Sequence, residues 1–168
     1  MKLEIIVLGR EILDGTVVDE FSYWIGKFLG DEHIIPTRVV VIGEEDLGAE
    51  VKSVLSNKTF DVLIIVCEFK PLKGDKILNL ISEMTGRQLL QNEKILKTAR
   101  KDLLESLGKE TPVLPEGADI VKNPQGGLLG FRIATQHCEI YVLPKKIDEL
   151  RLMLYDSIIP NLKKKLAF

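Results

Sequence analysis

A turn between a predicted strand and a predicted helix holds the first residues that could do chemistry. It runs from Cys67 to Asp75, directly after the apolar stretch at 62–66. In α/β proteins such turns commonly bind anions, and they are then rich in glycine, because bare peptide N–H groups can approach a phosphate closely. This turn contains one glycine, Gly74, and an acidic residue, Glu68. It therefore occupies the position of an anion site without the usual composition of one.

The carboxylate of Glu68 changes how this turn could bind an anion. Two anions about 4 Å apart repel by about 1 kcal/mol in water and by several times as much in a partly dry cleft. An uncompensated Glu68 would therefore weaken the binding of a phosphate by about tenfold or more. Lys70, Lys73 or a divalent cation could offset this repulsion. Two interpretations stay open, namely anion binding through lysine or metal, and loss of binding.

The first strand-to-helix loop, at 9–19, is a second candidate for ligand binding. Glu11 and Asp19 flank it, and Asp14 and Gly15 form a tight turn between them. In open α/β sheets, ligands bind beyond the carboxyl ends of the strands, near the point where the strand order reverses. Ligand contact is therefore predicted for these four residues. The alternative is a solvated loop in which Asp19 caps the next helix.

A glycine-rich segment, NPQGG at 123–127, precedes the last predicted strands. Gly126 and Gly127 tolerate positive φ angles, so the segment on its own predicts a turn. Asn123, Gly126 and Gly127 could instead form one wall of a ligand pocket. The sequence leaves both interpretations open.

Hydrophobic patterns predict the elements that position these loops. Apolar runs at 3–8 and 62–66 predict buried strands, and the β-branched stretch at 37–42 predicts a further strand. Apolar residues at helical spacing predict the helices, at 21–29, 47–55, 77–84, 96–107 and 147–158. Pro160 is expected to end or kink the last of them. Short strands at 131–134 and 139–143 are typical of a hairpin.

Buried strands that alternate with amphipathic helices indicate a parallel sheet covered on both faces. The predicted fold is therefore α/β, a three-layer α/β/α sandwich with a mostly parallel sheet and a C-terminal β-hairpin. At 168 residues, the chain suits a single domain over 1–168.

Bulk composition argues against several classes of partner. The net charge of −2 and the isoelectric point of about 5.8 give no general attraction to nucleic acid or anionic membranes. No apolar run approaches the length of about 18 residues that would span a membrane. Glu4 interrupts the apolar N-terminus, which favours a strand over a signal peptide, so a cytoplasmic location is expected. The expected partner is a small phosphate-bearing molecule, with no nucleic acid and no membrane.

Other reactive residue types carry weaker signals. Cys67 and Cys138 lack the spacing of metal ligands, and a structural role for Cys67 is favoured over a reactive thiol. His33 and His137 stand far apart and are interpreted as surface residues. Trp24 lies on the apolar face of its helix, which indicates the core.

Three ordered segments resemble the CinA-type N-terminal domain of the molybdopterin-binding-like superfamily, which serves molybdenum cofactor biosynthesis. They are GREILDGTVVDEFSYWIGKFL at 9–29, LPEGADIVKNPQGGLLGF at 114–131 and YVLPKKIDELRLML at 141–154. No single segment carries the resemblance, but all three occur in the family's order. Together they extend over nearly the whole chain.

This resemblance implies a three-layer α/β/α fold that binds molybdopterin or a nucleotide-like phosphate. Some CinA-type proteins are linked to pyrophosphatase chemistry on ADP-ribose-like substrates. By residue match, Asp75 would be a catalytic carboxylate that helps to hold Mg²⁺, a normal arrangement beside substrate phosphates. The alternative for Asp75 is an N-cap of the following helix. The loop at Asn123 would contact a pterin or a base, and relatives commonly form dimers or trimers, so a homo-oligomer is expected.

The chain departs from the family pattern in the turn after its third strand. The family has Thr-Gly-Gly-x-Gly-Pro-Thr there, whereas this chain has Cys67, Glu68 and Lys70 at the glycine positions. In the last segment a glycine is replaced by Lys145. The glycine-rich loop is therefore degenerate.

Two functions of different classes follow from these observations. The first is a molybdopterin- or nucleotide-binding domain, with Mg²⁺-dependent phosphoanhydride cleavage or nucleotidyl transfer if it is catalytic. The second is a catalytically inactive family member that acts as an assembly or regulatory subunit. A flavodoxin-like nucleotide fold is disfavoured, because it does not explain the ordered C-terminal segments.

Overall fold

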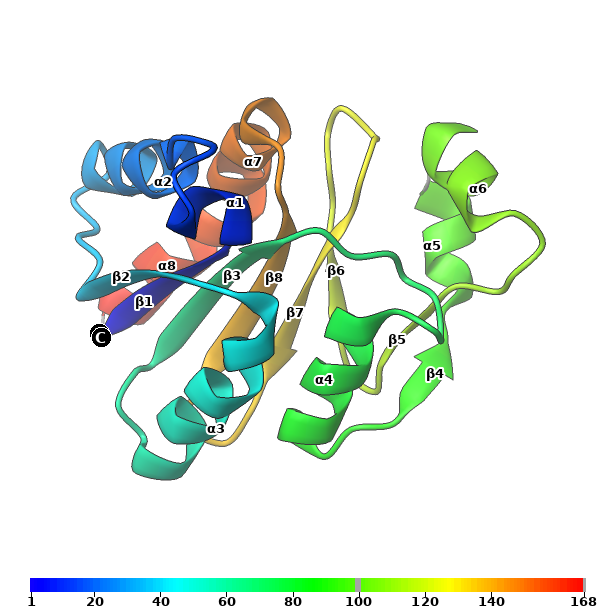
Figure 1. Cartoon of the computed structure of the whole chain (residues 1–168), viewed down its shortest axis with the longest axis horizontal. Helices are drawn as coiled ribbons and strands as arrows, with labels where there is room; N and C mark the ends of the chain where they lie inside the picture. Colours follow the sequence, from blue (N-terminus) through cyan, green and yellow to red (C-terminus); the bar gives the residue numbers. More distant parts are fainter. Residues whose placement is uncertain (99–100, 168) are drawn as a thin grey trace.

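Four parallel strands form the centre of the protein. The computed structural model describes residues 1–98 and 101–167, and its main sheet has the strand order β2-β1-β3-β8-β7-β6 (Figure 1). β1, β2, β3 and β8 run parallel, whereas β7 and β6 are antiparallel to their neighbours. The bounds are β1 Leu3–Leu8, β2 Arg38–Ile42, β3 Val62–Cys67, β6 Asp119–Val121, β7 Gly130–Ala134 and β8 Glu139–Pro144. The predicted mostly parallel sheet and C-terminal hairpin are confirmed.

Helices connect these strands and cover both faces of the sheet. Their bounds are α1 Arg10–Leu13, α2 Glu20–Gly30, α3 Leu47–Asn57, α4 Lys76–Thr85, α5 Glu93–Thr98, α6 Lys101–Leu107, α7 Ile147–Met153 and α8 Ile159–Leu166. A 3₁₀ turn at Glu44–Asp46 precedes α3, and a π-helical turn at Leu154–Ile158 joins α7 to α8. β4 Leu89–Gln91 and β5 Val113–Pro115 form a separate antiparallel pair. No helix in the part of the chain that is described has the length and apolar character needed to cross a membrane.

Alternate residues of the central strands face two separate cores. In β1, Ile5 and Val7 pack with α2, α7 and α8, whereas Ile6 and Leu8 pack with α3 and α4 on the opposite face. β1 and β3 are fully buried along their whole length, which explains why each reads as a continuous apolar run. These two cores create the three layers that the sequence predicts.

The structure corrects the boundaries of two predicted helices. Where a helix is predicted at 96–107, the described residues are helical at Glu93–Thr98 and at Lys101–Leu107, and Leu96 is 45% exposed rather than buried. Ala99, which the helical pattern included, lies outside the described residues. The last helix does not end at Pro160. The π-helical turn comes directly before α8, so proline falls in the first turn of α8, where its missing N–H costs no internal hydrogen bond.

One carboxylate is buried at the amino end of β1, far from the carboxyl ends of the strands. Glu4 is fully buried, and Nε of Arg38 on β2 lies 2.6 Å from its Oε1. Neither oxygen of Glu4 receives a hydrogen bond of good geometry from the described residues, and Arg38 also forms an ion pair with Glu50 on α3. Burial raises the pKa of Glu4 to about 7, which Arg38 opposes and Glu50 increases. The folded protein therefore favours the neutral form of this side chain near neutral pH.

We predict that this buried carboxyl makes the protein less stable as the pH rises. The pKa of Glu4 is higher in the folded state, so its contribution is complete below about pH 4.5 and is lost as the pH rises through about 7. The Glu4→Gln variant should match the wild type near pH 5 and exceed its free energy of unfolding by about 2–3 kcal/mol at pH 8. Urea denaturation between pH 5 and 8 measures this, with the exposed Glu83→Gln as control. Parallel pH curves for wild type and Glu4→Gln would contradict the prediction.

Candidate functional site

A crevice of about 420 Å³ opens at the carboxyl ends of the parallel strands. β1 continues into α2 on one face of the sheet and β2 into α3 on the other, so the strand order reverses between β1 and β3. Ligands of open α/β proteins bind at this kind of point. The volume is within the range of small-molecule sites, about 300–1,000 Å³. The crevice is therefore the candidate functional site.

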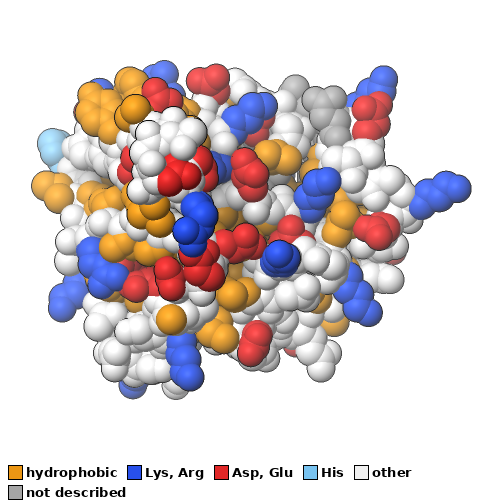
Figure 2. Space-filling model, in the orientation of Figure 1, with side chains coloured by type: hydrophobic (Ala, Val, Ile, Leu, Met, Phe, Trp, Pro, Cys, Tyr) orange, Lys and Arg blue, Asp and Glu red, His pale blue; other side chains and the backbone are white. Residues whose placement is uncertain are grey.

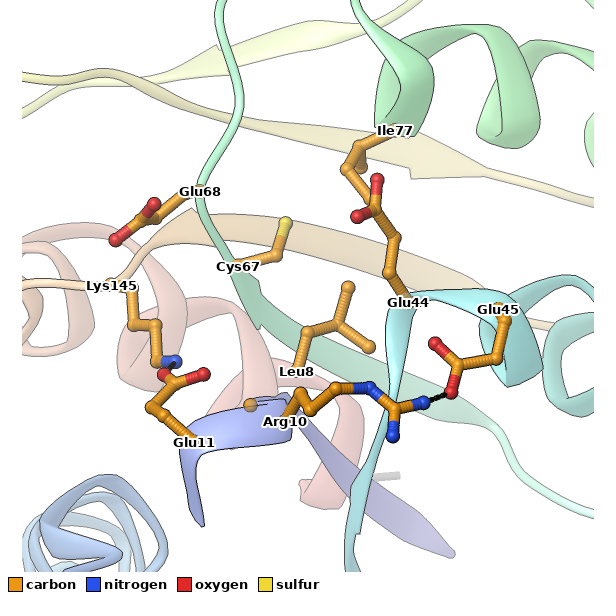
Figure 3. Close-up of a pocket in the computed structure, with 10 residues that line it drawn as sticks. Leu8, Arg10, Glu11, Glu44, Glu45, Cys67, Glu68, Ile77 and Lys145 are labelled. Carbon is orange, nitrogen blue, oxygen red and sulfur yellow. Dashed lines mark hydrogen bonds and ion pairs between the residues drawn. The ribbon is translucent and has the colours of Figure 1, made fainter. Parts of the chain in front are cut away.

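The crevice combines an apolar floor with a charged rim (Figure 3). Leu8 and Cys67 end β1 and β3, and Ile77 begins α4; these three form the apolar part. The charged residues come from the segments that follow β1, β2, β3 and β8: Arg10, Glu11, Glu44, Glu45, Glu68 and Lys145. Figure 2 shows acidic side chains gathered near the centre of this face.

Both cationic side chains of the rim are already paired with glutamates. Arg10 forms an ion pair with Glu45, and Lys145 forms one with Glu11. The hydrogen bond from Lys145 lowers the pKa of Glu11. Within residues 1–98 and 101–167, Glu44 and Glu68 have no ion-pair partner, so four glutamates face two cations. The rim therefore has an excess of negative charge.

The turn after β3 crosses the sheet toward the hairpin instead of wrapping around the crevice. Its Phe69 packs edge-on against Phe131 of β7, with ring centroids 5.4 Å apart. Glu68 lines the crevice as predicted, whereas Lys70 and Lys73 are exposed and are not among its lining residues. The aromatic side chain of the turn thus leaves the crevice open, and the two lysines do not offset the charge of Glu68 within it.

Asp75 acts on the backbone of its own turn. Oδ1 accepts a hydrogen bond from the N–H of Leu78 at 3.0 Å, which caps α4, and Oδ2 accepts one from the N–H of Lys70 at 2.8 Å. Asp75 is not among the residues that line the crevice. The geometry supports the capping role, and the catalytic role stays a prediction. Among the described residues, no group of three His, Cys, Asp or Glu side chains is arranged to hold a metal ion.

The first loop brings only one of its four candidates into the crevice. Glu11 lines it, as predicted. Asp14 accepts a hydrogen bond from the N–H of Thr16 at 2.9 Å, and Gly15 has a φ of +80°, as the tight turn requires. Asp19 accepts one from the N–H of Ser22 at 3.0 Å and caps α2. These three residues therefore shape the loop instead of facing the crevice.

The loop at 123–127 is held by a buried glutamate of α7. Nδ2 of Asn123 donates to Oε2 of Glu149 at 2.6 Å and to the carbonyl of Leu128 at 2.7 Å. Lys146 adds an ion pair of 3.0 Å with Oε1 of Glu149, which is only 3% exposed. Asn123, Gly126 and Gly127 line a different cavity, of about 410 Å³, next to α6. The loop and the crevice are thus separate features.

The two cysteines are not suited to nucleophilic chemistry. Both are free and buried. Burial raises the pKa of the Cys67 thiol far above its usual range, and it raises that of Cys138 to about 12. A thiolate, and not a thiol, is the nucleophile. The structural interpretation of Cys67 is therefore the one that the geometry supports.

Several residues of the rim were not predicted from the sequence. Arg10, Glu44 and Glu45 directly follow glycine-terminated strands, and their position at the carboxyl ends of β1 and β2 was the available signal. Lys145 was noticed only as the replacement of a family glycine. Glu149 was missed, although a glutamate three residues after a helix N-cap commonly turns back toward the backbone.

We predict that Asp75 contributes to stability as a cap. The Asp75→Ala variant should lose about 1–2 kcal/mol of unfolding free energy, because two backbone N–H groups lose their acceptor. Asp46→Ala is a matched control, since Asp46 occupies the N-cap of α3 without a side-chain cap bond and should be nearly neutral. Urea denaturation measures both. Equal stability of the two variants would show that the Asp75 cap contributes nothing.

We also predict that Glu149 orders the loop at 123–127. Glu149→Ala removes one of the two acceptors of Asn123 Nδ2 and the acceptor of the Leu128 N–H, so it should destabilise the protein by about 2–3 kcal/mol. Amide hydrogen exchange should accelerate in residues 123–130. The exposed neighbour Asp148→Ala should leave both measurements unchanged. Unchanged exchange in the Glu149 variant would contradict this role.

Comparison with known proteins supports the resemblance found in the sequence. No protein-family model matches the chain. A CinA-like protein of Geobacter metallireducens is 29% identical over 169 residues, which cover 95% of this chain and 40% of that protein. A Pyrococcus abyssi protein is 29% identical over 177 residues, which cover 96% of this chain and 70% of that protein. The chain thus spans less than half the length of the CinA-like relative.

Solved structures agree on the fold. The protein CinA from Thermoplasma acidophilum, described as having unknown function, matches with a TM-score of 0.72 at 20% identity, over 92% of this chain and 94% of that one. The molybdopterin biosynthesis enzyme MoaB from Thermus thermophilus matches with a TM-score of 0.61 at 14% identity, over 99% of this chain and 94% of that one. The resemblance predicted from the sequence is confirmed: the chain is similar to CinA-like proteins over nearly its whole length, and it has a MoaB/Mog-like fold.

Proposed function

We propose that the domain binds a small phosphate-bearing pterin or nucleotide in the crevice at the carboxyl ends of β1, β2, β3 and β8. The single observation that carries the proposal is the open cavity of about 420 Å³ at the point where the strand order reverses. Its apolar floor suits a flat ring, and its charged rim suits polar substituents. The likeness to a molybdopterin biosynthesis enzyme supports the same class of ligand.

Electrostatics set a condition on this binding. The glutamates outnumber the cations of the rim, and both cations are paired. A phosphate group must therefore compete with a glutamate for a cation, and it meets repulsion from Glu68 and Glu44. The proposal accordingly assigns the domain moderate affinity, with specificity for ligands that also fill the apolar floor.

The proposal contains no catalytic step. Both oxygens of Asp75 bind backbone N–H groups, and Asp75 does not line the crevice, so the described residues around it do not fit a Mg²⁺ site. Glu11 is not suited to act as a general base, because the hydrogen bond from Lys145 lowers its pKa. Mg²⁺-dependent cleavage or nucleotidyl transfer stays a prediction from the resemblance.

A second function is favoured by the charges of the rim. A family member that has lost ligand chemistry and serves as an assembly or regulatory subunit would tolerate the excess of glutamates and the loss of loop glycines. Homo-oligomer formation, as a dimer or trimer, stays a prediction that belongs to either function. Ligand binding separates the two, because an inactive subunit has no need of an affinity for pterins or nucleotides.

Isothermal titration calorimetry tests the proposal with ADP-ribose, ATP and molybdopterin, each with and without Mg²⁺. We expect one site per chain for at least one of these ligands and no release of phosphate or pyrophosphate by ³¹P NMR. The Glu68→Gln variant should bind about tenfold more tightly, because it removes a carboxylate from the rim. Glu116→Gln, an exposed residue outside the crevice, is the control.

Three outcomes are informative. No binding across the panel would reject the proposal in favour of the subunit function. Turnover of a bound ligand would show that the domain is an enzyme. Equal affinities for wild type and Glu68→Gln would show that the ligand binds elsewhere.

A further inference from the structure

We propose that Lys145 is the anion-binding residue of the crevice, and that a ligand phosphate binds it by displacing Glu11. This inference rests on the proposed function. In this arrangement a single lysine does what the peptide N–H groups of a glycine-rich turn would do. Lys145 lies on the wall opposite the turn after β3, and the family has a glycine at its position. The proposal is supported by the four residues that surround the lysine, Gly9, Glu11, Ile12 and Phe21.

First, Lys145 lies at the end of β8, on the wall of the crevice. It follows the last residue of β8, Pro144, which pairs with Cys67 at the end of β3. Its side chain runs along the wall of the crevice toward α1, as Figure 3 shows. The side chain is only 9% exposed, and Nζ lies 5.7 Å from the centroid of the Phe21 ring. A lysine in solvent would be far more exposed, so this ammonium group is held in place.

The second step is the space that the backbone leaves for the ammonium group. A methyl group placed on Gly9 would lie 3.2 Å from Nζ of Lys145 and 2.8 Å from Cδ1 of Ile12. Gly9 has a φ of −170°, which any residue can adopt, so its backbone angle does not require glycine. A side chain at this position would instead crowd the ends of the Ile12 and Lys145 side chains. Gly9 and Lys145 therefore fit together, and the lysine is part of the crevice wall.

The third step is the unequal exposure of the ion pair. A lysine ammonium group has three hydrogens to donate. In the part of the chain that the structure describes, Glu11 is its only hydrogen-bond acceptor, and Phe21 offers only a ring face. The Glu11 side chain is 44% exposed, compared with 9% for Lys145. Glu11 can therefore rotate into solvent at low cost, whereas Lys145 stays, and a phosphate oxygen can take the vacated place.

The other cations near the crevice fit this role less well. Arg10 is 69% exposed and its partner Glu45 is 53% exposed, so no wall fixes its position. Lys70 and Lys73 do not line the crevice. An opposite interpretation treats the Lys145–Glu11 pair as a plug that blocks ligands. The two interpretations predict opposite effects of removing the lysine.

The experiment compares Lys145→Met with Lys146→Met. The control removes a neighbouring lysine that also pairs with a glutamate but is not a lining residue of the crevice. Binding of inorganic pyrophosphate, ATP and adenosine is measured by calorimetry or by NMR titration. Lys145→Met should weaken pyrophosphate and ATP by about 10-fold to 100-fold and leave adenosine unchanged. Lys146→Met should bind all three as the wild type does.

Glu11→Gln supplies an independent test that does not disturb the buried lysine. Removal of the competing charge should tighten pyrophosphate binding by about twofold to fivefold. If Lys145→Met fails to fold, as judged by circular dichroism, Glu11→Gln decides alone, and an unchanged affinity overturns the inference. Unchanged or tighter pyrophosphate binding by Lys145→Met also overturns it, and tighter binding identifies a plug. Absence of binding by the wild type and by every variant would instead reject the proposed function.

Discussion

The parallel alignment of β1, β2, β3 and β8 is the constraint from which the candidate site follows. Parallel strands all end at the same edge, so the segments that leave them must meet there. β1 and β3 are buried on both faces, as is typical of parallel strands that are covered by helices. Charged residues that are far apart in sequence, such as Glu11 and Lys145, are thereby brought into contact. The order and direction of the strands, more than any sequence motif, determine where the crevice lies.

Competition between backbone and ligand explains how the polar residues are used. Asp19 and Asp75 stand directly before helices, where free N–H groups need acceptors. Each satisfies this need inside the chain. Asn123 instead donates from its side-chain amide to Glu149 and to the carbonyl of Leu128, and so holds its loop. A side chain that is committed in this way has little capacity left for a ligand or metal. The residues that remain for binding are those of the rim, where both cations pair with a glutamate and two further glutamates have no ion-pair partner among the described residues.

The sequence predicted the fold well because its signals are local and strong. Runs such as 62–66 are too apolar for any position except a sheet covered on both faces, and amphipathic helices alternate with them along the chain. The exposure of Leu96 was not predicted, since this residue fits the apolar spacing of the predicted helix and yet is 45% exposed. Local periodicity does not show which side of a short helix reaches the core.

The site was less predictable because it depends on contacts between distant segments. Glu11 and Glu68 were identified from their positions after strands, and both line the crevice. Their charge states and partners could not be predicted, since Lys145 lies 134 residues beyond Glu11. Asp75 shows a second limit of sequence-based prediction. An aspartate that caps a helix and an aspartate that binds a metal ion occur in the same sequence pattern. Only the positions of two backbone N–H groups distinguish them.

The short segment from Lys145 to Glu149 connects the crevice to the loop at 123–127. Lys145 lines the crevice. Glu149, in the first turn of α7, anchors the loop at 123–127. Five consecutive residues therefore hold both a wall of the crevice and the anchor of the loop beside the second cavity. A backbone shift caused by a substitution at one end would reach the other, and energies coupled through a backbone shift are not additive.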